Sequence, residues 1–262
     1  MADREEKETL KVSVITVAFN SEASIEKTIK SVLAQEYENL EYWIIDGAST
    51  DGTIRKAKNY KQAFEERGIA YHILSEPDKG IYDAMNKGIL KVTGEVTGIL
   101  NSGDRYTKDA VSVAVKTFQE TGCELMFGNV KIRTDGRGCV EKKAKQRRFF
   151  QTSRDWNHPT MFVKSELYKK YPFRNLGIHD DYEFYLRMRK QKRRIVTVNQ
   201  VLASFWLGGV SNRRGVKQAM KRIRDRYRFC YRINGYSRWY LIECISMEAA
   251  KWLYTRWLLP RK

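Results

Sequence analysis

The sequence predicts an α/β fold in which a doubly wound, mostly parallel β-sheet is flanked by helices. Short apolar runs of strand length alternate with segments of helical periodicity through the first hundred residues, in the order β-α-β-α-β-α-β. The chain has 262 residues, of which 42% are hydrophobic, so it can bury a sizeable core. Only four residues are proline, which argues against a proline-rich linker or stalk.

The first four strands are expected from runs of β-branched and aromatic residues. The run VSVITVAF at residues 12–19 is the clearest, because a continuous apolar run is typical of a parallel strand buried on both faces. Further strands are expected at residues 42–45, 71–74 and 96–100. The segments between them have helical patterns, which predict helices at residues 25–33, 53–64 and 82–91.

After Tyr106 the pattern is less regular. It predicts helices at residues 109–118, 161–171 and 181–190, and strands at residues 125–132 and 195–205. Residues 137–148 are expected to form a basic, glycine-containing loop. From residue 216 onward the chain is expected to be helical and basic.

Polar clusters follow three of the first four expected strands. They are residues 19–20, 46–51 and 101–104. Ligands of doubly wound sheets bind beyond the carboxyl ends of the strands, so these clusters predict a functional site at that edge.

The turn after the first strand lacks the glycines of the common nucleotide-binding loops. It reads Ala18-Phe19-Asn20-Ser21, so a dinucleotide fingerprint and a P-loop are both absent. A glycine-free loop cannot wrap a phosphate closely. We therefore expect a divalent cation, held by carboxylates, to neutralise phosphate charge.

The formal net charge of +18 favours an anionic partner, such as nucleic acid, an acidic membrane surface or phosphorylated ligands. Residues 213–262 contain 14 Lys and Arg residues against three acids, so the positive charge is concentrated in the C-terminal part. The four cysteines form no C-x-x-C pair and no His cluster adjoins them, so a zinc site is not expected.

The charged N-terminus has no apolar signal segment, which predicts a reducing, cytoplasmic location with free thiols. No transmembrane helix is expected either, because charged residues interrupt the most apolar stretch, residues 239–259.

Several segments in order resemble glycosyltransferase family 2. They are Phe19-Asn20, IIDGASTDGT (44–53), SEPDKGIYDAMNKGI (75–89), LNSGD (100–104), HPTMF (158–162), DDYEFYLR (180–187) and GGVS (208–211). The set is similar to members that build bacterial exopolysaccharides and colanic acid. The resemblance implies a GT-A fold, a nucleotide-diphosphate sugar donor, Mg²⁺ or Mn²⁺, and inversion at the anomeric carbon.

The resemblance also suggests a division of the chain. Residues 11–105 would form the nucleotide-sugar-binding half and residues 106–212 the acceptor-binding half. They would follow an N-terminal tail (1–10) and precede a basic amphipathic helical extension (213–262).

By resemblance, Asp104 is the metal ligand. Many relatives have two or three acids in this motif, whereas here Ser102 and Gly103 precede a single acid. The alternative is a turn residue before the next helix. The expected donor-binding residues are Val17, Phe19, Asn20, Asp46, Lys79, Asp83, Asn86, Asn101 and Ser102. Many relatives carry a second acid where this chain has Gly47, so the nucleotide base is not determined. Asp51 and Asp78 suit either a ligand role or a loop role.

Asp181 is the expected general base, which would take the proton of the acceptor hydroxyl. Asp180 is the competing carboxylate, and a helix-capping role is the alternative for either. His158 is expected near the metal and the acceptor, with a structural role as the alternative. Among the aromatic residues, Tyr82, Trp156 and Trp206 are candidates to stack on a sugar or base, although aromatic residues are more often core.

The C-terminal segment combines basic residues with Trp and Leu, which predicts peripheral binding to an anionic membrane surface at the inner membrane face. The alternative is a helix face packed on the catalytic domain. We expect a saccharide acceptor, lipid-linked in this type of family member. Two other functions remain open: a catalytically silent relative acting as an assembly partner, and a nucleic-acid-binding protein, although no nucleic-acid motif occurs.

Overall fold

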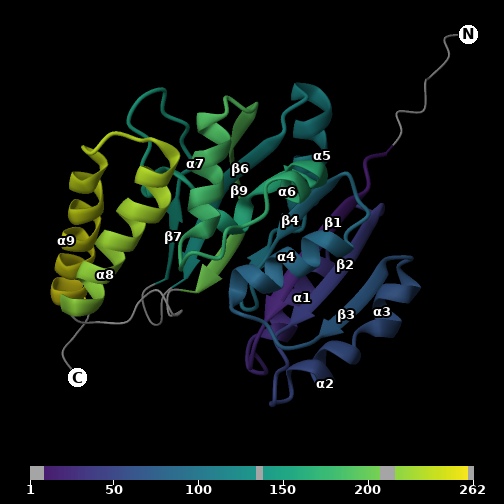
Figure 1. Ribbon diagram of the computed structural model, residues 1–262. Helices are drawn as coiled ribbons and strands as arrows, with labels where there is room; N and C mark the ends of the chain where they lie inside the picture. Colours follow the sequence, from purple (N-terminus) through teal and green to yellow (C-terminus); the bar gives the residue numbers. More distant parts are fainter. Residues whose placement is uncertain (1–8, 134–137, 207–215, 259–262) are drawn as a thin grey trace, which may run out of the picture. The chain divides into compact units, whose positions relative to one another are not determined.

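The computed structural model describes residues 9–133, 138–206 and 216–258 (Figure 1). The GGVS motif, most of the N-terminal tail, and Arg213 and Arg214 lie outside the described residues. The chain divides into two compact units. Within the described ranges, the first comprises residues up to 173 together with 194–206, and the second comprises residues 174–193 and 216–258. The two units are defined by contacts between residues and not by function. The donor-binding and acceptor-binding halves expected from the sequence therefore stay a prediction.

The first unit contains the parallel half of the sheet. Its strands are β1 (Val12–Ala18), β2 (Leu40–Asp46), β3 (Ala70–Ser75) and β4 (Val96–Ile99). They lie in the order β3-β2-β1-β4, and each pair is parallel. The β-α alternation expected for the first hundred residues is therefore confirmed.

Helices cover both faces of this half. On one face pack α1 (Ile25–Leu33), α2 (Thr53–Lys58), α3 (Lys61–Glu66) and α5 (Ala110–Thr121). On the other lie α4 (Ile81–Lys91) and α6 (Ser165–Lys170). A Cβ on Gly88 of α4 would lie 2.8 Å from Ile15 Cγ2, so glycine is what lets α4 approach the sheet so closely.

One expected helix is divided in two. Residues 53–64 were predicted to be continuous, but α2 ends at Lys58 and α3 begins at Lys61. Asn59, which lies at the break between the two helices, is a weak helix former. The next residue, Tyr60, donates a hydrogen bond from its hydroxyl to Glu26 at 3.0 Å.

The second half of the sheet is mixed. It adds β8 (Phe162–Lys164), β6 (Leu125–Arg133), β9 (Ile195–Trp206) and β5 (Arg105–Tyr106), in that order after β4, and β7 (Cys139–Lys142) pairs with β6. Among the described strands of this half, only β6 and β9 pair in parallel.

Two predictions for this half were wrong. Residues 161–171 were expected to be helical, but residues 162–164 form β8, because they pair antiparallel with both β4 and β6. Residues 137–148 were expected to be a loop, but Cys139–Lys142 pair with β6 as β7. In both cases long-range backbone pairing overrides the local pattern.

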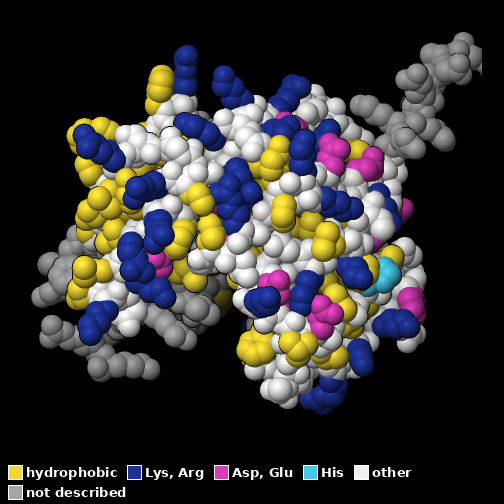
Figure 2. All heavy atoms as spheres, viewed as in Figure 1, with side chains coloured by type: hydrophobic (Ala, Val, Ile, Leu, Met, Phe, Trp, Pro, Cys, Tyr) yellow, Lys and Arg dark blue, Asp and Glu magenta, His cyan; other side chains and the backbone are white. Residues whose placement is uncertain are grey.

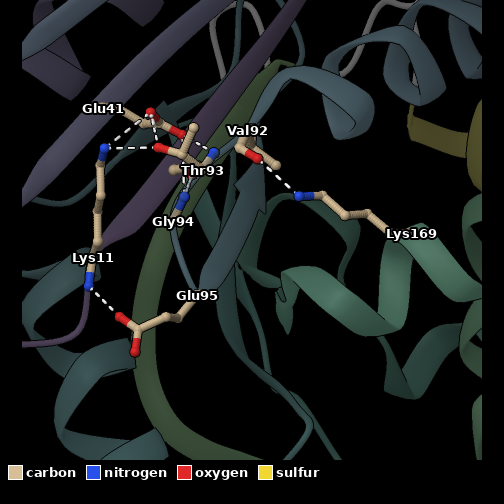
Figure 3. Close-up of polar contacts among 8 residues, drawn as sticks. Lys11, Glu41, Val92, Thr93, Gly94, Glu95 and Lys169 are labelled. Atoms are coloured by element: carbon tan, nitrogen blue, oxygen red, sulfur yellow. Dashed lines mark hydrogen bonds and ion pairs between the residues drawn. The ribbon is translucent and has the colours of Figure 1, made fainter.

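A buried carboxylate joins the amino ends of three parallel strands (Figure 3). Glu41 of β2 is 2% exposed. It accepts hydrogen bonds from the Ser13 hydroxyl (2.6 Å), the Thr93 amide (2.6 Å) and the Thr93 hydroxyl (2.7 Å), and its Oε2 lies 3.3 Å from Lys11 Nζ. Burial alone would raise the pKa of Glu41, but these partners lower it overall.

The second unit is helical. It contains α7 (Asp180–Lys190), α8 (Val216–Arg226), a π-helical turn η4 (Tyr227–Tyr231), a 3-10 turn η5 (Arg232–Asn234) and α9 (Tyr240–Leu258). The expected helices are thus confirmed. The Tyr182 hydroxyl of α7 lies 3.0 Å from the Tyr231 hydroxyl, and Tyr231 donates to Glu243 of α9. Among the described helices, none combines the length and apolar character needed to cross a bilayer.

Candidate active site

The polar clusters at the strand ends meet at one edge of the first unit. Ala18 of β1 pairs with Asp46 of β2, so the segments that follow both strands begin side by side. On the other flank of β1, the Ser102 amide donates to the Val17 carbonyl at 3.1 Å, which holds the segment after β4 beside β1. The prediction that these clusters share an edge is confirmed.

Asn20 connects the first two of these segments. It has a left-handed backbone (φ 45°), which Asn tolerates better than most residues. Its amide donates to the Ser49 hydroxyl at 2.8 Å, and its side-chain oxygen accepts the Thr50 amide at 2.9 Å. Phe19 next to it is 63% exposed, so a large apolar ring is available at this edge.

Asp46 is fully buried and bonded within its own loop. Its carboxylate accepts the Ser49 amide (2.8 Å), the Ser49 hydroxyl and the Ser75 hydroxyl (2.7 Å). In this arrangement it fixes the turn that presents Ser49 to Asn20. Direct contact with the donor stays a prediction for Asp46.

Asp78 occupies the space next to Gly47, where many relatives carry a second acid. A Cβ on Gly47 would lie 2.3 Å from the Asp78 carboxylate and 3.3 Å from the Phe19 ring. The sequence supplies a carboxylate here from another loop, 31 positions along the chain. Sequence reasoning left Asp78 undecided, because nothing local to Gly47 points to it.

At the start of α4, two of the predicted donor residues have structural partners. Asp83 accepts the Lys79 amide at 3.0 Å. Asn86 donates to the Phe173 carbonyl (2.8 Å) and accepts the Phe173 amide (3.0 Å), so both ends of its amide are engaged. The Lys79 side chain is exposed and, within the described part of the chain, makes no ion pair.

The loop that carries Asp104 is held from behind by Thr28 of α1. Thr28 Oγ1 accepts the Gly103 amide and donates to the Asp104 carbonyl, both at 2.8 Å. The Ser102 hydroxyl lies 3.3 Å from that of Ser24. Asn101 Oδ1 is shielded from solvent and has no hydrogen-bond partner among the described residues.

The Asp104 carboxylate has no hydrogen-bond or ion-pair partner in the described part of the chain, and burial raises its pKa to about 8. Nearby positive charge would reverse this shift, because it favours the ionised form. An unpaired, desolvated carboxylate suits a hard divalent cation. Within the ranges that the structure describes, no three His, Cys, Asp or Glu side chains converge as ligands, so substrate oxygens and water would have to complete the coordination.

Asp180 and Asp181 begin α7 in the second unit and have different surroundings. Asp180 is 1% exposed and accepts the amides of Leu176 (2.6 Å) and Gly177 (3.0 Å), so it holds the preceding loop. Burial raises its pKa, and those amides oppose the shift. Asp181 is half-buried, and its Oδ1 accepts the Tyr182 amide at 2.8 Å.

His158 lies in a 3-10 turn, η2 (His158–Thr160), and is 7% exposed. Thr160 Oγ1 accepts the Gly128 amide at 3.1 Å, and η2 packs against β6, β9, β5 and β4. Since β5 directly follows Asp104, η2 lies against the strand next to the expected metal ligand. Of the candidate stacking residues, Tyr82 and Trp156 are buried, whereas Trp206 is 46% exposed.

Comparison with known proteins identifies the family. A family model described as Glycosyl transferase family 2 matches residues 13–178. Glycosyltransferase Rv1514c of Mycobacterium tuberculosis is 35% identical over 210 residues, which cover 78% of each chain. TuaG of Bacillus subtilis, named as a teichuronic acid biosynthesis glycosyltransferase, is 33% identical over 116 residues, which cover 44% of this chain and 45% of TuaG.

The fold is also similar to that of a solved mannosyltransferase, PcManGT from Pyrobaculum calidifontis in complex with GDP-Man and Mn²⁺. The TM-score is 0.60 at 19% identity, and the match covers 97% of this chain and 77% of PcManGT. At that identity the likeness shows the fold alone. The matched family model, the Rv1514c relationship and the mixed sheet with its flanking helices lead to one conclusion: the chain belongs to glycosyltransferase family 2 and has the GT-A fold.

Proposed function

We propose that this glycosyltransferase moves a sugar from a nucleotide-diphosphate sugar to a saccharide acceptor, with inversion, and that it requires Mg²⁺ or Mn²⁺. The observation that carries the proposal is the unpaired carboxylate of Asp104, desolvated at the carboxyl edge of the sheet beside the loops of Phe19 and Asn20. The PcManGT complex with GDP-Man and Mn²⁺ supports it by analogy of fold.

The donor would lie along the edge formed by the segments after β1, β2 and β4. Phe19 offers an exposed ring, and Val17 and Asn20 shape the loop around it. Asn101 and Ser102 precede the metal ligand, and Lys79 offers a free cation for a phosphate. Asp46, Asp83 and Asn86 would act mainly by holding these groups in position.

Asp104 would hold the cation together with diphosphate oxygens of the donor. When bound, Mg²⁺ or Mn²⁺ supplies positive charge that stabilises the departing diphosphate. Asp181 would accept the proton of the acceptor hydroxyl as that oxygen bonds to the anomeric carbon and the bond to the diphosphate breaks. His158 would lie near the acceptor. A single displacement of this kind inverts the anomeric configuration.

The acceptor we propose is a lipid-linked saccharide in bacterial surface polysaccharide synthesis, in line with the name of TuaG. Such an acceptor places the enzyme in the cytoplasm at the inner membrane face. The second unit supports this location. Its described surface exposes apolar side chains on α8 and α9, and α8 also carries Lys and Arg residues (Figure 2).

Replacement of Asp104 tests the metal assignment. Asp104→Asn keeps the shape of the side chain and removes its charge, so turnover should fall about 100-fold or more. The rise in melting midpoint that UDP, GDP or TDP gives with Mn²⁺ should also be lost, because that rise reports binding to the native state. CMP serves as the monophosphate comparison.

Asp109→Asn is the matched control, because Asp109 sits five residues on and accepts a hydrogen bond from Gln200 at the surface. It should keep both properties. Wild-type turnover and metal-dependent stabilisation in Asp104→Asn would refute the metal site. Release of no nucleoside diphosphate from any donor by the wild type would favour the silent relative.

A further inference from the structure

A row of cations lies on one face of the strands that follow Asp104. Arg105 of β5 pairs with Ser204 of β9, and Ser204 pairs with Lys131 of β6. Residues directly opposite each other on neighbouring strands project from the same face, and so do residues two apart. Arg133 and Trp206, which pair with each other two positions along, therefore share this face with Arg105 and Lys131.

The opposite face confirms this assignment of sides. Tyr106, Ala203 and Val130, each one position away from the row, are buried in the hydrophobic core. Ile132 and Phe205 pack against the same core. The alternation is regular here, because the register shifts between β6 and β9 end at Val130.

Within the described part of the chain, the cations of the row have no acidic partner. Among the described residues, no ion pair involves Arg105, Lys131 or Arg133. Arg105 and Arg133 are half-buried, whereas Lys131 is exposed. Arg133 Nε is shielded from solvent without a hydrogen bond in the described structure. The nearest acid by register, Glu141 opposite Lys131, already accepts a hydrogen bond from Asn129 at 2.8 Å.

We propose that this row, through Lys131 and Arg133 at its β6 end together with the half-exposed Trp206, binds the phosphate or diphosphate group of the acceptor. Like charges repel, so neighbouring cations that form no ion pair among the described residues are stabilised when an anion binds between them. Trp206 provides an apolar ring on the same face, against which the adjoining sugar can pack. The inference rests on the proposed transfer reaction and specifies its acceptor.

Geometry separates this anion from the donor diphosphate. Neighbouring strands lie about 4.8 Å apart, so β5 and β6 are separated by roughly 10 Å across β9. Asp104 directly precedes β5, so a donor diphosphate held there would be nearest to Arg105 at the β5 end of the row. Lys131 and Arg133 at the β6 end are left for a second anion.

The test uses the full-length protein and two probes, inorganic pyrophosphate and farnesyl diphosphate, in EDTA so that no divalent cation takes part. Calorimetric titration should show binding of both probes and none of farnesol. Lys131→Gln combined with Arg133→Gln should weaken both affinities about tenfold or more, since charged hydrogen bonds are lost. The matched control is Lys61→Gln with Lys116→Gln, two exposed lysines of α3 and α5, which removes equal charge and should change affinity less than about twofold.

A second arm separates failure of this inference from failure of the proposed function. Binding of UDP or GDP with Mn²⁺ should be lost in Asp104→Asn but kept in the Lys131/Arg133 variant. Pyrophosphate binding in EDTA should be kept in Asp104→Asn but weakened in the Lys131/Arg133 variant. Equal pyrophosphate affinity in the wild type and the Lys131/Arg133 variant would overturn the acceptor site and leave the donor site standing. Loss of nucleotide binding in the Lys131/Arg133 variant would assign the row to the donor and would also overturn it.

Discussion

Two adjacent carboxylates at the start of α7 have different surroundings. Asp180 is buried and accepts hydrogen bonds from two backbone amides, so it anchors the loop before α7. Asp181 is half-buried, and the residues that follow it in α7, from Tyr182 to Met188, are buried. Asp181 stays the proposed general base.

Asp181→Asn should lower kcat roughly 10²- to 10⁴-fold, the usual contribution of a general base. The KM for the donor and its metal dependence should stay unchanged, because the base takes no part in binding the donor or the metal ion. Steady-state kinetics with a radiolabelled nucleotide sugar provides the measurement.

Asp180→Asn is the matched comparison. It should keep most of the turnover but lower the free energy of unfolding by about 1–3 kcal/mol, because two amides lose a charged acceptor. Abolished transfer in Asp180→Asn together with normal transfer in Asp181→Asn would reverse the assignment. A product that retains the anomeric configuration of the donor would instead exclude the single displacement.

At the scale of elements, Glu41 joins the amino ends of β1 and β2 to the turn before β4, at the edge of the sheet opposite the proposed site. The strands are short and parallel, so their alignment at one edge helps to determine the alignment at the other. The lowered pKa of Glu41 links this junction to pH.

Glu41→Gln should lower the free energy of unfolding at pH 7 by about 2 kcal/mol, because a buried, charged acceptor is replaced by a neutral amide. The folded-state pKa lies below the unfolded value, so the stabilisation is complete above about pH 4.5 and is lost as the pH falls through the folded pKa. The difference between wild type and variant should therefore shrink below about pH 4.5 in urea titrations. A difference that stays constant down to pH 3 would contradict the role of the charge.

At the scale of the whole molecule, the net charge of +18 and the surface of the second unit are the features that concern membrane binding. In α9, Glu243, Cys244 and Glu248 are buried, while Ile242 and Ile245 are about half exposed. Arg222 of α8 forms a bidentate pair with Glu248, with contacts of 2.7 to 3.1 Å. One face of these helices thus packs within the unit, and the other presents apolar side chains.

The packed face agrees with the alternative of a helix packed within the protein, and membrane binding by the exposed face stays a prediction. Removing the whole segment is a poor test of membrane binding, because it would also remove Tyr231 and Cys230 from the interior of the unit. Substitutions on the exposed face are sharper.

Trp239→Ser, Ile242→Ser and Ile245→Ser together should reduce sedimentation with anionic liposomes several-fold, because the apolar side chains that enter the interface are lost. Leu90→Ser, on the exposed surface of α4, is the control and should have no effect. In the wild-type protein, 1 M salt should also weaken sedimentation, because it screens the basic residues. Unchanged sedimentation of the triple variant would argue against the membrane role.

The sequence by itself determined the fold class, the edge at which the polar clusters meet and, through the resemblance of its motifs, the family. The fold class and the edge follow from local information: strand runs, helical periodicity and polar residues directly after strands. Asp104, Asp181 and Phe19 can be proposed from the resemblance, because each belongs to a short motif at the end or start of one element. The local pattern also explains the misassigned segments, since β7 and β8 exist only through their pairing partners.

The tertiary structure alone decided which predicted residues are engaged by protein groups. Asp46 is bonded to Ser75, 29 positions away, and Asn86 to Phe173, 87 positions away. The row of Arg105, Lys131, Arg133 and Trp206 likewise depends on the register of three strands. Register is set by long-range packing, and a shift of one residue would move every side chain to the other face. No local pattern specifies that register, so these partners and this surface were beyond the reach of the sequence.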